Sequence, residues 1–178
     1  MKTNCLFITA FTLLSILVHG QTKLNPVIKD YGTMYDVPFA KDKINPSKKY
    51  KIIVESAATI EKPEEIYAPF EHISRMYNLH VYSGVPQKNL FVEVVVFGPS
   101  VSVLLNNDAY KQKFGIDNPN LKIIEEMTKA GIKVHACAQS IMLVGIDPAT
   151  VNPNIDMVVS RFTTVSDRQM KGYAFFKF

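Results

Sequence analysis

The sequence predicts an α/β fold in which a mostly parallel sheet of about five strands is covered by helices on both faces. Two observations lead to this prediction. The strand-like stretches are apolar along their whole length, which is typical of strands that are buried on both faces. They also alternate with stretches of helical periodicity, the order that a parallel sheet requires. Because the chain has no internal repeat and no low-complexity tract, we expect a single domain over residues 48–178.

The first 20 residues have the pattern of a secretory signal peptide. Lys2 supplies positive charge, residues 6–18 form an apolar run, and Gly20 ends the segment on a small residue. This run is shorter than the roughly 20 apolar residues that a membrane-spanning helix needs. We therefore expect cleavage after Gly20, export to the periplasm or to the medium, and no membrane span.

Residues 21–47 are predicted to be an extension that lies over the domain or frays from it, because they contain three prolines and no sustained period. Lysines concentrate at its end, with five lysines against one aspartate over residues 41–51. Such a run favours a solvated lead-in segment over a binding patch. No aromatic residues alternate with base-reading side chains there, so the sequence does not support nucleic-acid binding.

The first predicted strand, residues 50–56, has an apolar centre that indicates burial on both faces. Pro63 and the two glutamates that follow it are typical of the first turn of a helix. Apolar residues then recur on one stripe as far as Tyr77. Because Pro69 interrupts this stripe, we expect a kink there or a helix that restarts.

Nearly every residue is apolar over 89–97, which predicts the most deeply buried strand of the chain. Gly98 and Pro99 end this strand at what should be the carboxyl edge of the sheet. A short apolar helix is expected over residues 101–105, and the polar residues 106–108 are expected to break it.

The middle of the chain contains a second helix and the strand around which the sequence is organised. Asn118 and Pro119 are a good helix cap and first helical residue, and the predicted helix ends at Gly131. A short buried strand then leads to Cys137, and a short apolar helix follows it and closes at Gly145. Beyond this helix, we expect a strand over residues 155–159, a helix over 161–171 and a closing strand over 173–178.

Cys137 is predicted to lie at the carboxyl end of a strand and directly before a helix, where ligands and reactive groups collect in α/β sheets. Backbone N–H groups and the positive end of the dipole at a helix start favour a thiolate over a thiol. Cys137 is therefore a candidate nucleophile, and once Cys5 leaves with the signal peptide it has no intramolecular disulfide partner. The alternative is that Cys137 is a small buried hydrophobic residue.

His135 lies two residues before Cys137, so both side chains should leave the same face of the strand. It is a candidate for assisting the thiol, as a proton acceptor or as a cation beside the thiolate. The alternative is a histidine that is simply packed or hydrogen-bonded within the sheet. The histidines show no zinc-site spacing, and Cys-x-x-Cys, Gly-x-Ser-x-Gly and a phosphate-binding glycine loop are all missing, so we expect no metal and no cofactor.

Several short motifs, in order, carry a resemblance to a known family. They are Lys51-Ile52-Ile53-Val54, Gly98-Pro99, Gly131, Val134-x-x-Cys137-x-Gln139-Ser140, Gly145-Ile146-Asp147-Pro148 and Gly172-Tyr173-Ala174. Taken together, they resemble the DsrE/DsrF-like (DsrEFH-like) sulfur-metabolism family over residues 48–178. The resemblance implies a three-layer α/β/α sandwich that assembles as a homo-oligomer, a trimer or a hexamer. In the sulfurtransferase members a cysteine carries sulfur as a persulfide, and here that cysteine can only be Cys137.

The leading hypothesis is therefore an exported sulfur carrier that takes sulfane sulfur from a donor protein or molecule and passes it to a partner thiol. The family's well-understood members work inside the cell, whereas this chain carries a predicted signal peptide. The first alternative is a non-catalytic binding or assembly module in which Cys137 is buried. The second is a small-molecule pocket at the carboxyl edge of the sheet. Its predicted binding residues are Gly98, Pro99, Ala138, Gln139 and Ser140.

Overall fold

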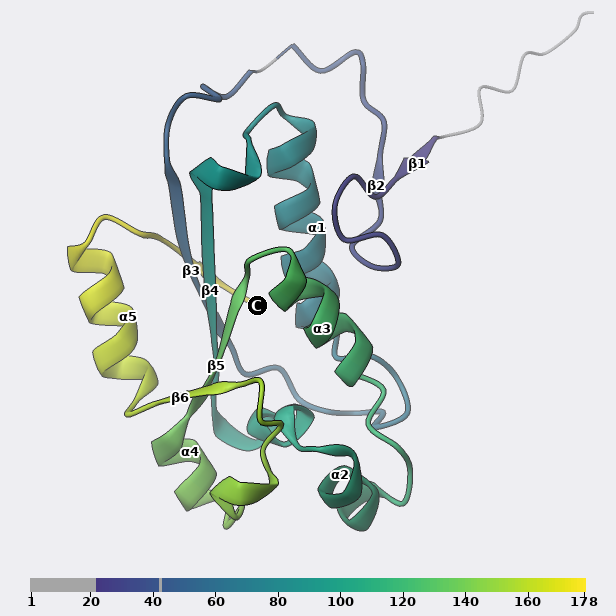
Figure 1. Cartoon of the computed structure of the whole chain (residues 1–178), viewed down its shortest axis with the longest axis vertical. Coiled ribbons are helices and arrows are strands. Elements are labelled where there is room, and N and C mark those ends of the chain that lie inside the picture. The colour runs from purple at the N-terminus through teal and green to yellow at the C-terminus, as the bar shows by residue number, and fades with distance from the viewer. Residues whose placement is uncertain (1–21, 42) are drawn as a thin grey trace, which may run out of the picture.

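A five-stranded parallel sheet forms the centre of the protein in a computed structural model that describes residues 22–41 and 43–178 (Figure 1). The strand order is β6-β5-β4-β3-β7, and every neighbouring pair is parallel. The strands are β3 (Tyr50–Ser56), β4 (Leu90–Val96), β5 (Lys133–Cys137), β6 (Asp156–Val158) and β7 (Ala174–Lys177). This arrangement confirms the predicted parallel sheet. The predicted signal peptide lies outside the described residues.

Helices cover both faces of the sheet, which confirms the three-layer α/β/α architecture. Helices α1 (Ala68–Tyr82) and α3 (Leu121–Lys129) lie on one face, and α5 (Arg161–Met170) lies on the other (Figure 1). Near the carboxyl ends of the strands lie α2 (Asn107–Phe114), α4 (Ala138–Leu143) and the 3-10 helix η2 (Gly98–Leu104). Two more 3-10 turns, η1 (Gln87–Asn89) and η3 (Pro148–Thr150), precede β4 and β6.

The two faces of the sheet are packed differently. A large apolar core fills the space between the sheet and helices α1 and α3. The space beneath α5 holds only a small buried cluster, made by Ile53, Val95, Cys137 and Val165. Since side chains alternate between the faces along each strand, β5 directs Val134 and Ala136 into the large core and Cys137 toward α5.

Some helices begin at other residues than the sequence predicts: α3 begins at Leu121 with Asn120 as its N-cap, not at Asn118 and Pro119. The helix expected from Pro63 begins at Ala68, and Pro69 lies in its first turn, where its missing N–H costs no hydrogen bond and causes no kink. Residues 106–108 follow the end of the short apolar helix, as predicted, because η2 ends at Leu104, but they also begin a new helix, which the sequence did not predict. Asn106 caps α2, because its side chain accepts a hydrogen bond of 2.9 Å from the N–H of Ala109.

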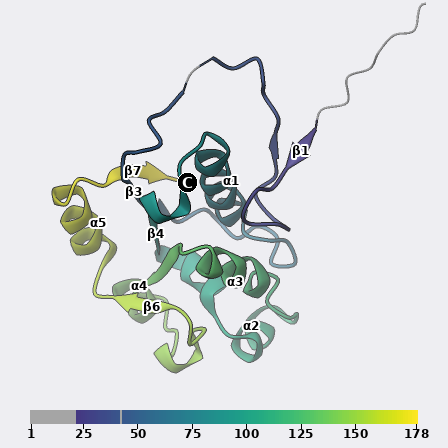
Figure 2. The same ribbon diagram turned by 45° about the horizontal axis from the view of Figure 1, so that its top comes forward.

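The segment before β3 lies along α1, where it includes the short strands β1 (Lys23–Leu24) and β2 (Met34–Tyr35) (Figures 1 and 2). Asn78 of α1 is fully buried and binds this segment by five hydrogen bonds. It accepts from the N–H groups of Val27 and Ile28 and donates to the carbonyls of Ile28, Tyr31 and Gly32, at 3.0–3.2 Å. A Cβ at Gly32 would lie 2.3 Å from a backbone nitrogen of α1, so the contact requires glycine.

No helix within residues 22–41 and 43–178 is both long and apolar enough to cross a bilayer.

Candidate functional site

Cys137 ends β5 and is the N-cap residue of α4, so the predicted position at a strand-to-helix junction is found in the structure. It is a free cysteine with no disulfide. Its side chain faces the layer occupied by α5, and the residue is only 2% exposed. The thiol is therefore shielded from solvent in the single protomer.

Hydrogen-bond donors surround the buried sulfur. The backbone N–H of Arg161, the first residue of α5, lies 3.4 Å from Sγ of Cys137. Burial by itself raises the pKa of the thiol. Hydrogen bonds from the Ser140 hydroxyl and from the backbone N–H groups of Arg161, Ser140 and Gln139 outweigh burial and hold the pKa below its ordinary value. The arrangement can thus stabilise a thiolate although water is excluded.

The start of α5 is positioned by its own sequence. Ser160 has extended backbone geometry, and its hydroxyl accepts a hydrogen bond of 3.1 Å from the N–H of Phe162, as an N-cap residue should. Because the Ser160 hydroxyl accepts from the N–H of Phe162, it does not bind the N–H of Arg161, which donates to the sulfur of Cys137 instead. The positive end of the dipole of this ten-residue helix therefore faces the thiol.

The side chain of Arg161 is also fixed beside this site. Its guanidinium Nη1 lies 2.9 Å from Oε1 of Glu55, a buried carboxylate near the end of β3. The guanidinium carbon is 4.2 Å from the ring centre of Phe97 and 4.0 Å from that of Phe162, so two aromatic rings contact the cation. None of these residues belongs to a motif that is recognisable in the sequence. Their only sequence signal is that a strand end and a helix start carry opposite charges.

A second buried polar network lies on the same face of the sheet and contains His135. Its Nε2 is 3.0 Å from Oε2 of Glu93, which also accepts 3.0 Å hydrogen bonds from Nε of Arg168. The hydroxyl of Tyr173 donates to Glu93 as well, at 3.2 Å. Because a carboxylate only accepts, Nε2 of His135 carries a proton. Nδ1 of His135 is buried and has no hydrogen-bond partner among the described residues.

His135 and Cys137 are thus both buried on β5, but their hydrogen bonds go to different groups. His135 binds Glu93, whereas the thiol receives hydrogen bonds from Ser140 and from the start of α5. An assisting role for His135 remains a prediction.

The predicted binding residues divide into two groups. Ser140 and Gly98 are brought together, because the N–H of Gly98 donates a hydrogen bond of 2.9 Å to the Ser140 hydroxyl. This bond ties the start of η2 to α4 beside the thiol. Ala138 is half-buried and Gln139 is exposed at the first turn of α4, while Pro99 lies on the wall of a cavity that Cys137 does not line.

Exposed apolar side chains lie near the thiol end of the sheet and were not identified from the sequence. They belong to the end of α4 and to the segment that enters α5: Met142, Leu143, Val159 and Phe162, which are 68%, 84%, 72% and 68% exposed. We call these four residues the apolar patch. Exposed apolar groups of this kind mark surfaces where proteins associate.

Among residues 22–41 and 43–178, no group of three His, Cys, Asp or Glu side chains is placed to hold a metal ion. The groups that lie at the site offer the chemistry of a thiolate stabilised by hydrogen-bond donors.

Comparisons with known proteins identify the fold and the family. The solved structure of MTH1491, a protein of unknown function from Methanobacterium thermoautotrophicum, is similar with a TM-score of 0.52 and 20% identity, over 72% of this chain and 98% of that one. The YchN protein of E. coli is similar with a TM-score of 0.50 and 12% identity, over 72% of this chain and 99% of that one. None of the curated proteins compared with the chain matches it. The model of the DsrE/DsrF-like family matches residues 52–178, which contain all but the first two residues of the five-stranded sheet and all its helices, and the chain therefore belongs to this family.

Proposed function

We propose that the protein is a sulfur carrier that holds sulfane sulfur as a persulfide on Cys137 and passes it to a partner thiol. One observation carries the proposal: hydrogen-bond donors converge on the sulfur and lower the pKa of the Cys137 thiol against the effect of burial. A cysteine that only fills space in a core has no need of such donors. Membership of a sulfur-metabolism family supports the same chemistry.

The proposed reaction has two steps. In the first, the Cys137 thiolate attacks the sulfane sulfur of a donor such as thiosulfate, a new S–S bond forms, and sulfite leaves with the electron pair of the broken S–S bond. In the second, an acceptor thiolate attacks the outer sulfur of the persulfide. Cys137 then leaves as a thiolate, which the donors from Ser140 and Arg161 stabilise.

Access to the sulfur is part of the proposal, because Cys137 is 2% exposed. The N–H of Arg161 contacts Sγ directly, so a donor can reach the sulfur only if the first turn of α5 moves away. Few apolar side chains hold α5 to the sheet, since the cluster beneath it has four buried residues. Movement of this turn must break the ion pair between Arg161 and Glu55, but it exposes less apolar surface than opening the large core on the opposite face.

The low exposure of Cys137 also favours the second candidate function, a non-catalytic binding or assembly module. In that case the thiol is a core residue, and the apolar patch on α4 and at the start of α5 is the functional surface. The two candidates differ in one property, the reactivity of Cys137 in the folded protein.

The experiment compares the folded protein, lacking the predicted signal peptide, with its Cys137→Ser variant. Each is treated first with iodoacetamide over a series of pH values and then, separately, with inorganic polysulfide, and intact mass is read. We expect folded wild type to be alkylated below the ordinary pKa of a thiol and to gain the mass of a sulfur atom that glutathione removes. Cys137→Ser should do neither. A thiol that reacts only after denaturation contradicts the sulfur-carrier proposal and supports the assembly module.

A further inference from the structure

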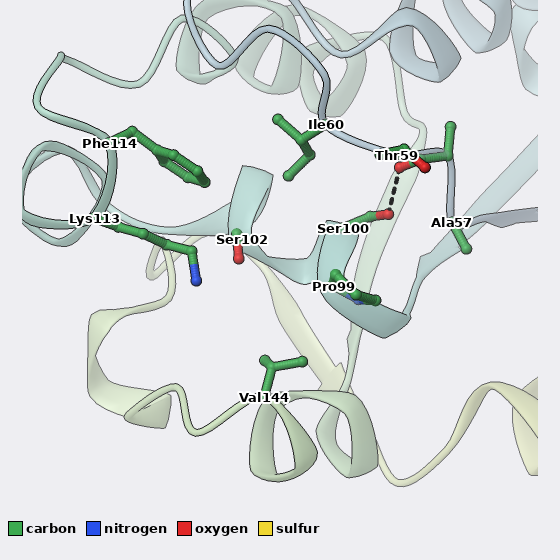
Figure 3. A pocket seen from close by; sticks show the side chains of 10 residues that line it. Ala57, Thr59, Ile60, Pro99, Ser100, Ser102, Lys113, Phe114 and Val144 are labelled. Atoms are coloured by element: carbon green, nitrogen blue, oxygen red, sulfur yellow. Dashed lines mark hydrogen bonds between the residues drawn. The ribbon is translucent and has the colours of Figure 1, made fainter.

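A cavity of about 280 Å³ opens at the carboxyl edge of the sheet, on the side of η2 and α4 (Figure 3). The loop after β3, η2, the end of α2 and the end of α4 form its walls. Its ten lining residues include Ile60, Ser102, Lys113, Phe114 and Val144. Cys137 is not among them, so this cavity is distinct from the thiol site.

Ser102 provides an unpaired polar group inside the cavity. The residue is 2% exposed, and its hydroxyl points into the cavity (Figure 3). Within the part of the chain that the structure describes, this hydroxyl makes no hydrogen bond to another residue. The neighbouring Ser100 differs, because its hydroxyl donates to the carbonyl of Ala58 at 2.7 Å. The Ser102 hydroxyl is therefore free to form a hydrogen bond with water or with a ligand in the cavity.

Lys113 provides a positive charge at the same place. Its side chain extends from α2 toward the cavity, on the side where Ser102 lies (Figure 3). No carboxylate of the described residues forms an ion pair with Lys113, whereas Lys111, on the same helix, pairs with Asp117 at 3.1 Å. The cavity lining contains no acidic residue. An anion would therefore find a cation that no protein carboxylate neutralises.

The remaining walls are apolar. Ile60, Phe114 and Val144 surround the space between the loop after β3 and α4 (Figure 3). Ligand pockets usually measure about 300–1,000 Å³ and combine apolar walls with a few polar groups. A cavity of 280 Å³ lies just below this range, which limits it to a small, ring-sized ligand. The lining thus offers an aromatic and aliphatic surface for a ring and one charged end for an acid.

We propose that this cavity binds a small carboxylate with a ring-sized apolar body. The carboxylate accepts hydrogen bonds from the Lys113 ammonium and the Ser102 hydroxyl, and the ring lies against Phe114 and Ile60. The proposal does not depend on the reactivity of Cys137, so it can hold or fail independently of the sulfur-carrier function.

The test uses benzoate as the probe and the folded protein without the predicted signal peptide. Backbone amide signals are followed by NMR during titration with benzoate and, in parallel, with neutral benzyl alcohol. We expect saturable shifts at the amides of Ser102, Lys113 and Phe114, with benzyl alcohol binding at least about tenfold more weakly because it lacks the charge-assisted hydrogen bonds.

Two lysine variants make the test specific. Lys113→Gln should weaken benzoate binding by about tenfold, because it removes the charge that faces the cavity. The matched variant Lys111→Gln, on the same helix but paired with Asp117, should bind benzoate as wild type does. Both lysines are dispensable for the core, and the amide spectrum shows whether each variant is folded. Absent or non-saturable shifts, shifts elsewhere in the protein, equal affinity for benzyl alcohol, or equal weakening by the two variants would overturn the proposal.

Discussion

At the residue scale, Ser140 has a larger part in the thiol site than its place beside Cys137 in the sequence suggests. A hydroxyl offers one donor and two acceptors, so it can donate to Sγ of Cys137 while it accepts from the N–H of Gly98. The side chain is thus held in place by η2 while it stabilises the thiolate. The protonation state of the Cys137 thiol therefore depends on the Ser140 hydroxyl as well as on the backbone N–H groups at the starts of α4 and α5.

Ser140→Ala should raise the pKa of the Cys137 thiol, since burial remains while one donor is lost. It should also lower the free energy of unfolding by about 1–2 kcal/mol, because the N–H of Gly98 loses its acceptor. The ultraviolet absorbance of the thiolate against pH measures the first effect, and chemical denaturation the second. Ser166→Ala, at an exposed serine of α5, is the control. An unchanged thiol titration in Ser140→Ala would show that the hydroxyl does not donate to the sulfur.

At the scale of elements, α5 is attached to the sheet by two partly buried ion pairs as well as by apolar contacts. Arg161 binds Glu55 of β3, and Arg168, two helical turns further on, binds Glu93 of β4. Residues seven apart lie on one face of a helix, and both carboxylates project from the face of the sheet beneath it. Ion pairs depend on orientation more than apolar contacts do, so they fix the position of the first turn of α5 over the thiol.

The Glu93 network predicts a specific dependence of stability on pH. Burial would raise the pKa of Glu93, but hydrogen bonds from His135 and Arg168, and the charge of Arg168, lower it from 4.5 to about 2. Since the pKa is lower in the folded state, the stabilisation is complete above the unfolded value and is lost as the pH falls from about 4.5 toward 2. Over this window wild type should lose about 3 kcal/mol from this group.

Glu93→Gln should remove this pH-dependent loss and should already cost about 3 kcal/mol at neutral pH, because it leaves Arg168 without its buried partner. Denaturant unfolding at several pH values measures both effects. Glu125→Gln is the matched control, since Glu125 pairs with Lys129 on the surface, where ion pairs contribute little. If Glu93→Gln and wild type lose stability in parallel over this range of pH, the network does not contribute as proposed.

At the scale of the whole molecule, the parts that the sequence could predict are those with a local cause. Continuous apolar runs identify parallel strands, and a strand followed by a short helix places Cys137 at their junction. The ion pairs of Glu55 and Glu93 join residues 106 and 75 positions apart, so they depend on strand register and on the placement of α5. No pattern in a single sequence predicts ion pairs between residues so far apart in the chain.

The same reason explains other features that only the structure supplies. The segment before β3 has no periodicity, and its attachment depends on one buried side chain of α1, Asn78, and on the close approach at Gly32. The cavity beside η2 combines four separate stretches of chain. Pro99 was identified because it follows a strand, whereas Ser102 and Lys113 become binding residues only when η2 and α2 are placed together.

The apolar patch leads to a prediction about assembly. Its four residues lie at the end of α4 and at the entry to α5, the two helices that contact Cys137, and Leu143 is 84% exposed. We predict that copies of the chain associate through this patch, as the family resemblance also implies, because association removes these side chains from water. The assembly would then cover the route to the thiol, so access to Cys137 would depend on the partner copy as well as on the first turn of α5.

Leu143→Asp should therefore shift the protein toward the monomer, because a carboxylate at the contact would have to be desolvated in the assembly. Light scattering coupled to size-exclusion chromatography measures the mass over a range of concentrations. Met170→Asp is the matched control: Met170 is 89% exposed, but it lies at the opposite end of α5 from the thiol. Association that persists in Leu143→Asp, or that is lost equally in Met170→Asp, would place the contact elsewhere. Faster alkylation of Cys137 in the Leu143→Asp monomer would link assembly directly to the protection of the thiol.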